Sequence, residues 1–199
     1  AQAKTGSGKT LAFLLPIIEQ VMRREASSPA PGPYTKSGPS HLSGPKFLVL
    51  APTRELALQI EMELRKYAPM SVTSLSVYGG TPIERHYRAL QRPPVVVVGT
   101  PGRLLDLAGS GHLKLGGVTF LVMDEADQML DRGFLRDIQR IIRLLPAERQ
   151  TLLFSATFSG DIQTLAQSMQ RDPARISVDP GINSPTTIVH AYYVVPGDQ

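Results

Sequence analysis

The sequence has no cysteine, and it has no apolar run long enough to cross a membrane. Without cysteine, the chain can form neither a disulfide framework nor a thiolate metal site, and its redox compartment stays unreadable. A membrane span needs about 18 to 20 consecutive apolar residues, so we expect a soluble protein without a membrane partner. The histidines do not cluster at metal-ligand spacing. We interpret them as surface or packing residues: His41, His86, His112 and His190.

The sequence does contain a moderate excess of basic residues. Lysine and arginine number 21 against 17 aspartates and glutamates in 199 residues, which gives a formal net charge of +4. Such an excess is compatible with a polyanionic partner without being diagnostic of one. The hydrophobic content of 42% can support a core, and the length suits one large domain or slightly more.

Short apolar segments alternate with amphipathic ones after residue 46. Near-continuous apolar strands that alternate with helices are typical of a parallel sheet covered on both faces. We therefore predict an α/β fold: a doubly wound parallel sheet with helices on both faces, in which ligands bind beyond the carboxyl ends of the strands. The predicted strands are 47–50, 74–78, 95–98, 120–123 and 151–154, and the predicted helices are 11–24, 54–67, 82–91, 101–110, 126–145 and 160–171.

Residues 25–45 form a stretch rich in proline, glycine, serine and alanine, with almost no large apolar side chain. Such a segment cannot bury enough surface to offset its chain entropy, so we predict a disordered surface insertion. Tyr34, Lys36 and His41 within it could contact a partner, but a tethered loop without a ligand is the simpler interpretation.

The first ten residues contain a glycine-rich segment that runs into the first predicted helix. In a G-x-x-x-x-G-K-[ST] loop, backbone N–H groups cradle a polyphosphate, the lysine adds positive charge, and the hydroxyl ligates Mg²⁺. Lys9 and Thr10 match the last two positions, while Ala3 stands where the pattern has its first glycine. A glycine-rich helix start without a ligand is the alternative. The candidate phosphate-binding residues are Thr5, Gly6, Ser7, Gly8, Lys9 and Thr10.

The start of the chain bears on its origin. A phosphate loop normally follows a buried strand, and none precedes it here, while residue 1 is not methionine. We therefore expect that the native N-terminus has been lost, together with any targeting peptide. The localisation that we expect is intracellular, in a compartment that the sequence does not give.

Polar residues follow each of the next three predicted strands. Arg54 lies in the first turn of a predicted helix, where the helix dipole opposes a cation. A nearby phosphate would remove that cost, but so would an ion pair with Glu55 or another carboxylate. Glycines and free N–H groups at helix starts suit either a phosphate backbone or plain turns. The strand-end residues are Pro52, Thr53, Arg54, Gly79, Gly80, Thr100, Gly102 and Arg103.

Acidic residues follow the strand predicted at 120–123. Asp124 is the metal candidate, because a carboxylate that leaves a buried strand end can hold Mg²⁺, and Glu125 is the candidate general base. The alternative is an acidic helix N-terminus that the helix dipole stabilises. After the last predicted strand, Ser155 and Thr157 could hydrogen-bond to Asp127, or they could cap an ordinary turn.

Together, the segments AKTGSGKT, PTRELALQ, GG, TPGR, DEAD and SAT occur in the order and rough spacing of the DEAD-box RNA helicases. Over about residues 1–178 the chain resembles the first RecA-like domain of that family, a P-loop fold. The resemblance implies ATP-dependent, non-processive remodelling of RNA duplexes. It implies ATP and Mg²⁺ as cofactors and RNA as a partner.

The resemblance also implies roles for the residues that match the family's motifs. Lys9, Asp124 and Glu125 would be catalytic, and Thr10 and Asp124 would hold the metal next to ATP on residues 5–10. RNA would be bound through its backbone, largely independently of base sequence. The RNA-binding residues would be Pro52, Thr53, Arg54, Gly80, Thr100, Gly102 and Arg103. The residues that couple hydrolysis to strand separation would be Asp127, Ser155 and Thr157.

Parts of the family's pattern are missing from the sequence. The segment that recognises adenine lies upstream of the phosphate loop, so base specificity cannot be checked. Residues 179–187 resemble the interdomain linker, and residues 188–199 resemble the truncated start of the second RecA-like domain. Because arginines of that second domain complete the ATP site, we expect these 199 residues alone to hydrolyse ATP poorly or not at all.

The motifs leave two other functions open. An RNA-binding clamp or scaffold would use ATP to close on RNA without unwinding it, and it would use the same residues. A DNA helicase or another P-loop ATPase is disfavoured only by the family resemblance. Stimulation by single-stranded RNA as against DNA would decide.

Overall fold

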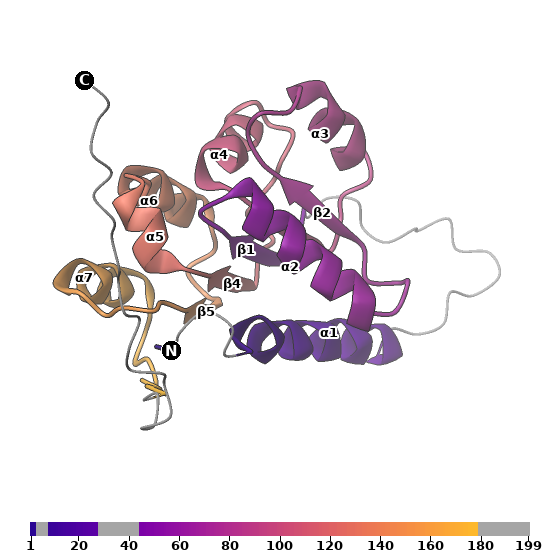
Figure 1. Ribbon diagram of the computed structural model, residues 1–199. Coiled ribbons are helices and arrows are strands. Elements are labelled where there is room, and N and C mark those ends of the chain that lie inside the picture. Colours follow the sequence, from indigo (N-terminus) through magenta and orange to yellow (C-terminus); the bar gives the residue numbers. More distant parts are fainter. Residues whose placement is uncertain (3–7, 28–43, 179–199) are drawn as a thin grey trace, which may run out of the picture.

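The structure, a computed structural model, describes residues 1–2, 8–27 and 44–178. Its centre is a five-stranded, all-parallel sheet with the strand order β2-β3-β1-β4-β5 (Figure 1). The strands lie within a residue of their predicted bounds, and the predicted α/β fold is confirmed. The strands are β1 Phe47–Leu50, β2 Ser74–Val77, β3 Val96–Gly99, β4 Phe120–Met123 and β5 Gln150–Leu153.

Helices cover both faces of this sheet (Figure 1). Successive side chains of a strand point to opposite faces. In β1, Phe47 and Val49 therefore join one core with α1 and α2, while Leu48 and Leu50 join a second core with α3 to α7. The helices are α1 Lys9–Ser27, α2 Arg54–Tyr67, α3 Ile83–Leu90, α4 Pro101–Gly109, α5 Ala126–Asp131, α6 Leu135–Leu144 and α7 Gly160–Met169.

The predicted helix 126–145 is wrong as one continuous element. The structure divides it into α5 and α6, and Gly133 between them has a φ of +80°. Glycine reaches this left-handed conformation without steric cost, so it ends one helix and allows the next to begin in a new direction.

The predicted insertion also begins too early. Residues 25–27 are the last residues of α1, and Pro45 is buried next to β1. Residues 28–43 lie outside the described residues, so their disorder stays a prediction. Residues 179–199, which the sequence assigns to a linker and a second domain, also lie outside. None of the described helices is both long enough and apolar enough to cross a membrane.

The strand order determines which loops are neighbours. β1 lies between β3 and β4, and the register pairs Leu50 with Gly99 on one side and with Met123 on the other. The segments after these strands therefore leave the same edge of the sheet side by side. Gly99 has a particular role there, because a Cβ at this position would lie 2.5 Å from the Val77 carbonyl oxygen. Only glycine allows β2 and β3 to approach so closely.

Candidate functional site

Asp124 is a buried carboxylate at the end of β4. The residue is 3% exposed, and its Oδ1 accepts a hydrogen bond of 3.0 Å from the Glu125 backbone N–H. Burial raises the pKa of Asp124 to about 6, although the positive charge of Lys9 opposes the rise. Burying an anion is unfavourable unless a cation or hydrogen bonds compensate it. A cation at this point would therefore stabilise both the carboxylate and the fold.

Glu125 stands at the turn between β4 and α5. Its φ and ψ are both 52°, which places a non-glycine residue in the left-handed region, and its side chain is half-buried. Such backbone strain persists only where the surroundings hold it, and it occurs often at functional sites. The backbone fixes the turn on both sides: the Asp124 N–H donates to the Leu50 carbonyl, and the Ala126 N–H donates to the Phe154 carbonyl.

Asp127 connects α5 to the segment that follows β5. Its Oδ2 accepts hydrogen bonds from the Ala156 N–H at 3.1 Å, the Thr157 N–H at 2.9 Å and the Thr157 hydroxyl at 3.1 Å. Burial alone would raise the pKa of Asp127, but these bonds and the Gln128 N–H outweigh it and lower the pKa. Asp127 is therefore an anion that is held mainly by backbone N–H groups.

Ser155 is the least directly connected of the predicted coupling residues. Its hydroxyl is fully buried and makes no hydrogen bond of full geometry within the described ranges, yet its side chain is among the hydrogen-bonding groups that lower the pKa of Asp127. The Ala156 N–H, which the sequence did not single out, is a further donor to Asp127. The predicted link between Asp127 and the segment after β5 is therefore present most clearly through Thr157.

The phosphate-loop residues fall partly within the structure. Thr5, Gly6 and Ser7 lie outside the described residues. Gly8 is exposed with a φ of +83°, and Lys9 and Thr10 open α1. The charge of Lys9 acts on Asp124 and also lowers the pKa of the Ala1 amino group, after the effect of burial. Lys9 and Asp124, which are 115 positions apart in the chain, thus belong to one electrostatic site.

Arg54 is exposed at the start of α2, after β1. Its guanidinium carbon lies 4.9 Å from the centroid of the Tyr78 ring, a distance typical of a cation–π contact. Of the two explanations that the sequence left open, the ion pair finds no support in the described part of the chain, where no carboxylate lies within ion-pair distance of Arg54. Among these residues, the positive charge at this helix start is therefore paired with no acid.

Arg103 lies at the start of α4, and its side chain is only 13% exposed. One terminal nitrogen, Nη1, donates to the Thr81 carbonyl at 2.8 Å and lies 3.1 Å from Nδ1 of His86. Nε lies 3.7 Å from a carboxylate oxygen of Asp106. Neighbours from one loop and two helices, α3 and α4 itself, therefore fix the guanidinium.

The remaining residues that the sequence predicted for RNA binding lie at the same edge of the sheet, where most of them form helix starts or turns. Thr53 caps α2, because its hydroxyl accepts the Leu56 N–H at 3.1 Å, while Pro52 is buried beside it. Thr100 is the residue before α4, and Gly102 is half-buried in its first turn. Gly80 is exposed with a φ of +75°.

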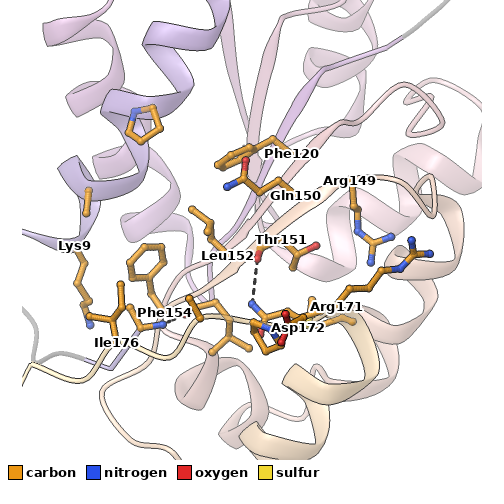
Figure 2. A pocket seen from close by; sticks show the side chains of 18 of the residues that line it. Lys9, Phe120, Arg149, Gln150, Thr151, Leu152, Phe154, Arg171, Asp172 and Ile176 are labelled. Atoms are coloured by element: carbon orange, nitrogen blue, oxygen red, sulfur yellow. Dashed lines mark hydrogen bonds between the residues drawn. The ribbon is translucent and has the colours of Figure 1, made fainter.

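A cavity of about 750 Å³ lies along β5 (Figure 2). Lys9 lines one end of it, and Arg149 and Arg171 line the other. Two further lining residues are joined by a hydrogen bond, which Gln170 donates to the Thr151 carbonyl at 3.1 Å. Neither Asp124 nor Glu125 lines this cavity. The cavity therefore reaches the start of α1 but lies mainly along the edge strand β5, and it does not include Asp124 or Glu125.

The sequence did not identify Tyr78 and His86 as parts of the site. His86 is buried between Arg103 and the Tyr78 ring, which is edge-on to it at a centroid distance of 5.8 Å. His86 and Arg103 are 17 positions apart, and only the pairing of β2 with β3 brings them together. Among the described residues, no group of three or more histidines, aspartates and glutamates could hold a metal ion, and His41 and His190 lie outside these residues.

Comparison with protein families gives one match over most of the chain. The family described as DEAD/DEAH box helicase matches residues 1–165. Among curated proteins, the chain is 46% identical over 178 residues to the chloroplastic DEAD-box ATP-dependent RNA helicase 3A of Zea mays, which covers 89% of this chain and 23% of that protein. It is 44% identical over 178 residues to the DEAD-box ATP-dependent RNA helicase CshA of Geobacillus kaustophilus, and this alignment covers 89% of this chain and 34% of that protein. The chain thus spans about a quarter to a third of the length of these relatives.

Solved structures agree with this comparison. A DEAD box protein from the hyperthermophile Methanococcus jannaschii is 36% identical, with a TM-score of 0.71 over 86% of this chain and 42% of that one. The yeast DEAD-box splicing factor Prp28 is also 36% identical, with a TM-score of 0.73 over 85% of this chain and 38% of that one. The similarity therefore extends from the sequence to the arrangement of the strands.

Proposed function

Since the chain belongs to the DEAD/DEAH box helicase family, we propose that it is the first RecA-like domain of an ATP-dependent RNA helicase. It would bind Mg²⁺–ATP and the backbone of single-stranded RNA, and hydrolysis would drive local unwinding or remodelling of an RNA–protein complex. The observation that carries this proposal is the buried carboxylate of Asp124, on which the positive charge of Lys9 acts. It lies at the edge of the sheet where the loops with the candidate arginines and glycines also leave β1, β2 and β3.

The residues present fit a nucleotide with its metal. Carboxylate oxygens are preferred Mg²⁺ ligands, and the raised pKa of Asp124 indicates an anion that still lacks compensation. When bound, Mg²⁺–ATP would supply the phosphate bond that is hydrolysed. Thr10 would add a hydroxyl ligand and Lys9 a positive charge near the terminal phosphates, with backbone N–H groups of residues 5–8 around them. Glu125 would accept the proton of the attacking water.

The proposed RNA contacts lie on the other half of the same edge. Backbone N–H groups at helix starts and arginine side chains are the usual ligands of phosphates, and they carry little base information. Arg54 and Arg103 supply the charge, while Thr53, Gly80, Thr100 and Gly102 supply hydroxyl and backbone groups. Binding would consequently be selective for RNA through its 2′-hydroxyls but largely independent of base sequence.

Asp127 and Thr157 would connect the two activities. Their hydrogen bonds join the helix after Glu125 to the segment after β5. A change at the nucleotide would reach this segment through α5, and the second RecA-like domain of the longer protein would receive it. That second domain would also complete the ATP site, so the 199 residues alone would turn over ATP slowly or not at all.

The experiment that tests this function is the ATPase rate with single-stranded RNA, with single-stranded DNA of the same sequence, and without nucleic acid. It is carried out on this chain and on a protein that also contains the second RecA-like domain. The proposal expects turnover stimulated by RNA alone, and only in the longer protein. If the longer protein closes on RNA with ATP but hydrolyses no faster and unwinds nothing, an ATP-gated clamp is the better description. Equal stimulation by DNA would contradict RNA selectivity.

A further inference from the structure

Four side chains form a continuous row across the ends of β1, β2 and β3, and the motifs name only the two outer ones. We call them the arginine row: Arg54, Tyr78, His86 and Arg103. Arg54 lies over the Tyr78 ring, the Tyr78 ring meets His86 edge-on at an interplanar angle of 85°, and His86 Nδ1 lies 3.1 Å from Arg103 Nη1. The two inner residues therefore join both arginines that the proposed function assigns to RNA.

The contact with Arg103 determines the protonation state of His86. A guanidinium has only donors, so Nδ1 of His86 must accept, and the ring proton must be on Nε2. A hydrogen bond between the ring and the Ser76 backbone is compatible with this tautomer. An imidazolium would have no acceptor and would place a second cation against Arg103. The hydrogen bond therefore exists only while His86 is neutral.

The surroundings of His86 also favour the neutral ring. His86 is 4% exposed, and burial, followed by the charge of Arg103, lowers its pKa. Arg85 on the same helix acts in the same direction, while the Ser76 bond opposes it. The other titratable groups nearby are the Tyr78 phenol and Asp106, which pairs with Arg103 at 3.7 Å. The His86–Arg103 contact is therefore favoured at neutral pH and is lost at acidic pH, where the ring becomes protonated.

The contact leaves part of Arg103 available. Nη1 and Nε are the nitrogens that contact Thr81, His86 and Asp106, and Nη2 has no hydrogen-bond partner among residues 1–2, 8–27 and 44–178. A guanidinium that is already fixed loses less side-chain freedom when it binds a phosphate.

We infer that neutral His86 is a positioning residue for RNA binding: it holds the Arg103 guanidinium in place for a backbone phosphate, and protonation of His86 releases it. This inference rests on the proposed function, specifically on the RNA contact of Arg103. The ligand is a phosphodiester of single-stranded RNA, and His86 acts on it only through Arg103. RNA affinity consequently decreases at acidic pH through one buried ring.

The test measures binding of a fluorescein-labelled oligouridylate by anisotropy, from pH 5.5 to 8.0 at constant ionic strength, in the protein that includes the second RecA-like domain. His86→Leu removes the acceptor, and about one hydrogen bond's net free energy corresponds to roughly fivefold weaker binding at pH 7.5. His86→Gln has a carboxamide acceptor and donor but does not titrate. It restores most of the affinity that His86→Leu loses, and it lacks the acidic decrease of the wild type. His112→Gln, an exposed histidine, is the matched control and retains the wild-type profile.

Arg103→Ala separates failure of the inference from failure of the proposed function. If Arg103→Ala weakens RNA binding, and His86→Leu weakens it no further in the double variant, the inference is supported. If Arg103→Ala weakens binding but His86→Leu binds as wild type, or His86→Gln keeps the acidic decrease, the positioning role is contradicted. If Arg103→Ala binds RNA as wild type, the RNA contact of Arg103 is wrong, and the inference fails with it. Thermal unfolding of each variant excludes binding losses caused by misfolding.

Discussion

The two halves of the sheet edge differ in the sign of their charge and in how each charge is held. After β4, Asp124 and Asp127 are carboxylates held by backbone N–H groups, and those on Asp127 include two from the segment after β5. After β1 and β3, Arg54 and Arg103 are cations held by an aromatic ring, a carbonyl and a histidine. Because both halves lie on adjoining strands, a metal–nucleotide site and a phosphate-backbone site can share one rigid support. The acidic half is suited to a cation and chemistry, and the basic half is suited to a polyanion.

The comparison predicts first that removing the proposed general base of the acidic half strongly reduces ATP turnover but does not weaken RNA binding. In Glu125→Gln, general-base catalysis is lost, so the RNA-stimulated ATPase rate falls by about 10²- to 10⁴-fold. RNA affinity in the presence of ATP stays equal or rises. Glu148→Gln, at an exposed glutamate after α6, is the matched control and retains turnover. A Glu125→Gln protein with wild-type turnover would show that Glu125 is not the base.

The second prediction concerns the free energy of unfolding, which the buried charge of Asp124 in the acidic half lowers. The pKa of Asp124 in the folded protein, about 6, lies above its unfolded value of 3.8, so the fold disfavours the charged form. The cost is absent below pH 4 and fully present above pH 6, where two pKa units correspond to at most about 3 kcal/mol. Asp124→Asn is expected to raise the free energy of unfolding at pH 7.5 in the absence of nucleotide, and to lose ATPase activity.

Chemical denaturation at pH 4.0 and pH 7.5 checks that prediction. The difference between Asp124→Asn and wild type should shrink toward zero at the lower pH. Asp161→Asn, at an exposed aspartate in the first turn of α7, serves as the control. If Asp124→Asn is less stable than wild type at pH 7.5, the carboxylate is compensated by the fold and is not waiting for a cation.

The third prediction concerns the basic half. Arg54→Ala removes one phosphate contact, which corresponds to about tenfold weaker RNA binding. The slope of log affinity against log salt concentration decreases in magnitude by about 0.7. ATP binding without RNA does not change, because Arg54 pairs with no acidic residue in the described part of the chain, Asp124 and Glu125 included. Arg88→Ala, at an exposed arginine of α3, keeps both the affinity and the slope. An unchanged slope in Arg54→Ala would mean that Arg54 does not contact a phosphate.

The smallest effect is expected at the Asp127–Thr157 contact, which we propose couples the two halves. Thr157→Val removes the hydroxyl bond to Asp127 but keeps the backbone N–H bond, so about 1 kcal/mol is lost. We expect ATP and RNA to bind separately as in wild type, while the stimulation of ATPase by RNA decreases by about fivefold. Measuring ATPase rates against RNA concentration tests this, with Thr164→Val, at an exposed threonine of α7, as the control. A loss of ATP affinity instead would assign Thr157 to nucleotide binding.

The sequence predicted the local elements of both halves well, because each has a local cause. Four consecutive apolar residues make β1 and β4, and the Thr53 cap starts α2 at its predicted residue. The break at Gly133 was missed, although a glycine in a helical pattern is a known warning. Residues 25–27 were missed because α1 continues past its last apolar positions.

The sequence could not predict the partners of the site residues in the same way. The order β2-β3-β1-β4-β5 depends on long-range pairing, and no periodicity encodes it. Without that order, His86 has no visible relation to Arg103, nor has Tyr78 to Arg54. The motifs therefore named the charged ends of the arginine row and not the two rings between them. Likewise, no local pattern identified the Ala156 N–H as a partner of Asp127.

One experiment tests most directly whether the two halves have separate functions. It measures the ATPase rate of wild type and of Arg103→Ala as a function of single-stranded RNA concentration, in the protein that includes the second RecA-like domain. The account predicts the same maximal rate at saturating RNA and about a tenfold higher RNA concentration at half-saturation for the variant. A lower maximal rate with unchanged half-saturation would place Arg103 in the chemistry of ATP hydrolysis. That result would contradict the separation of an acidic, nucleotide-binding half from a basic, RNA-binding half.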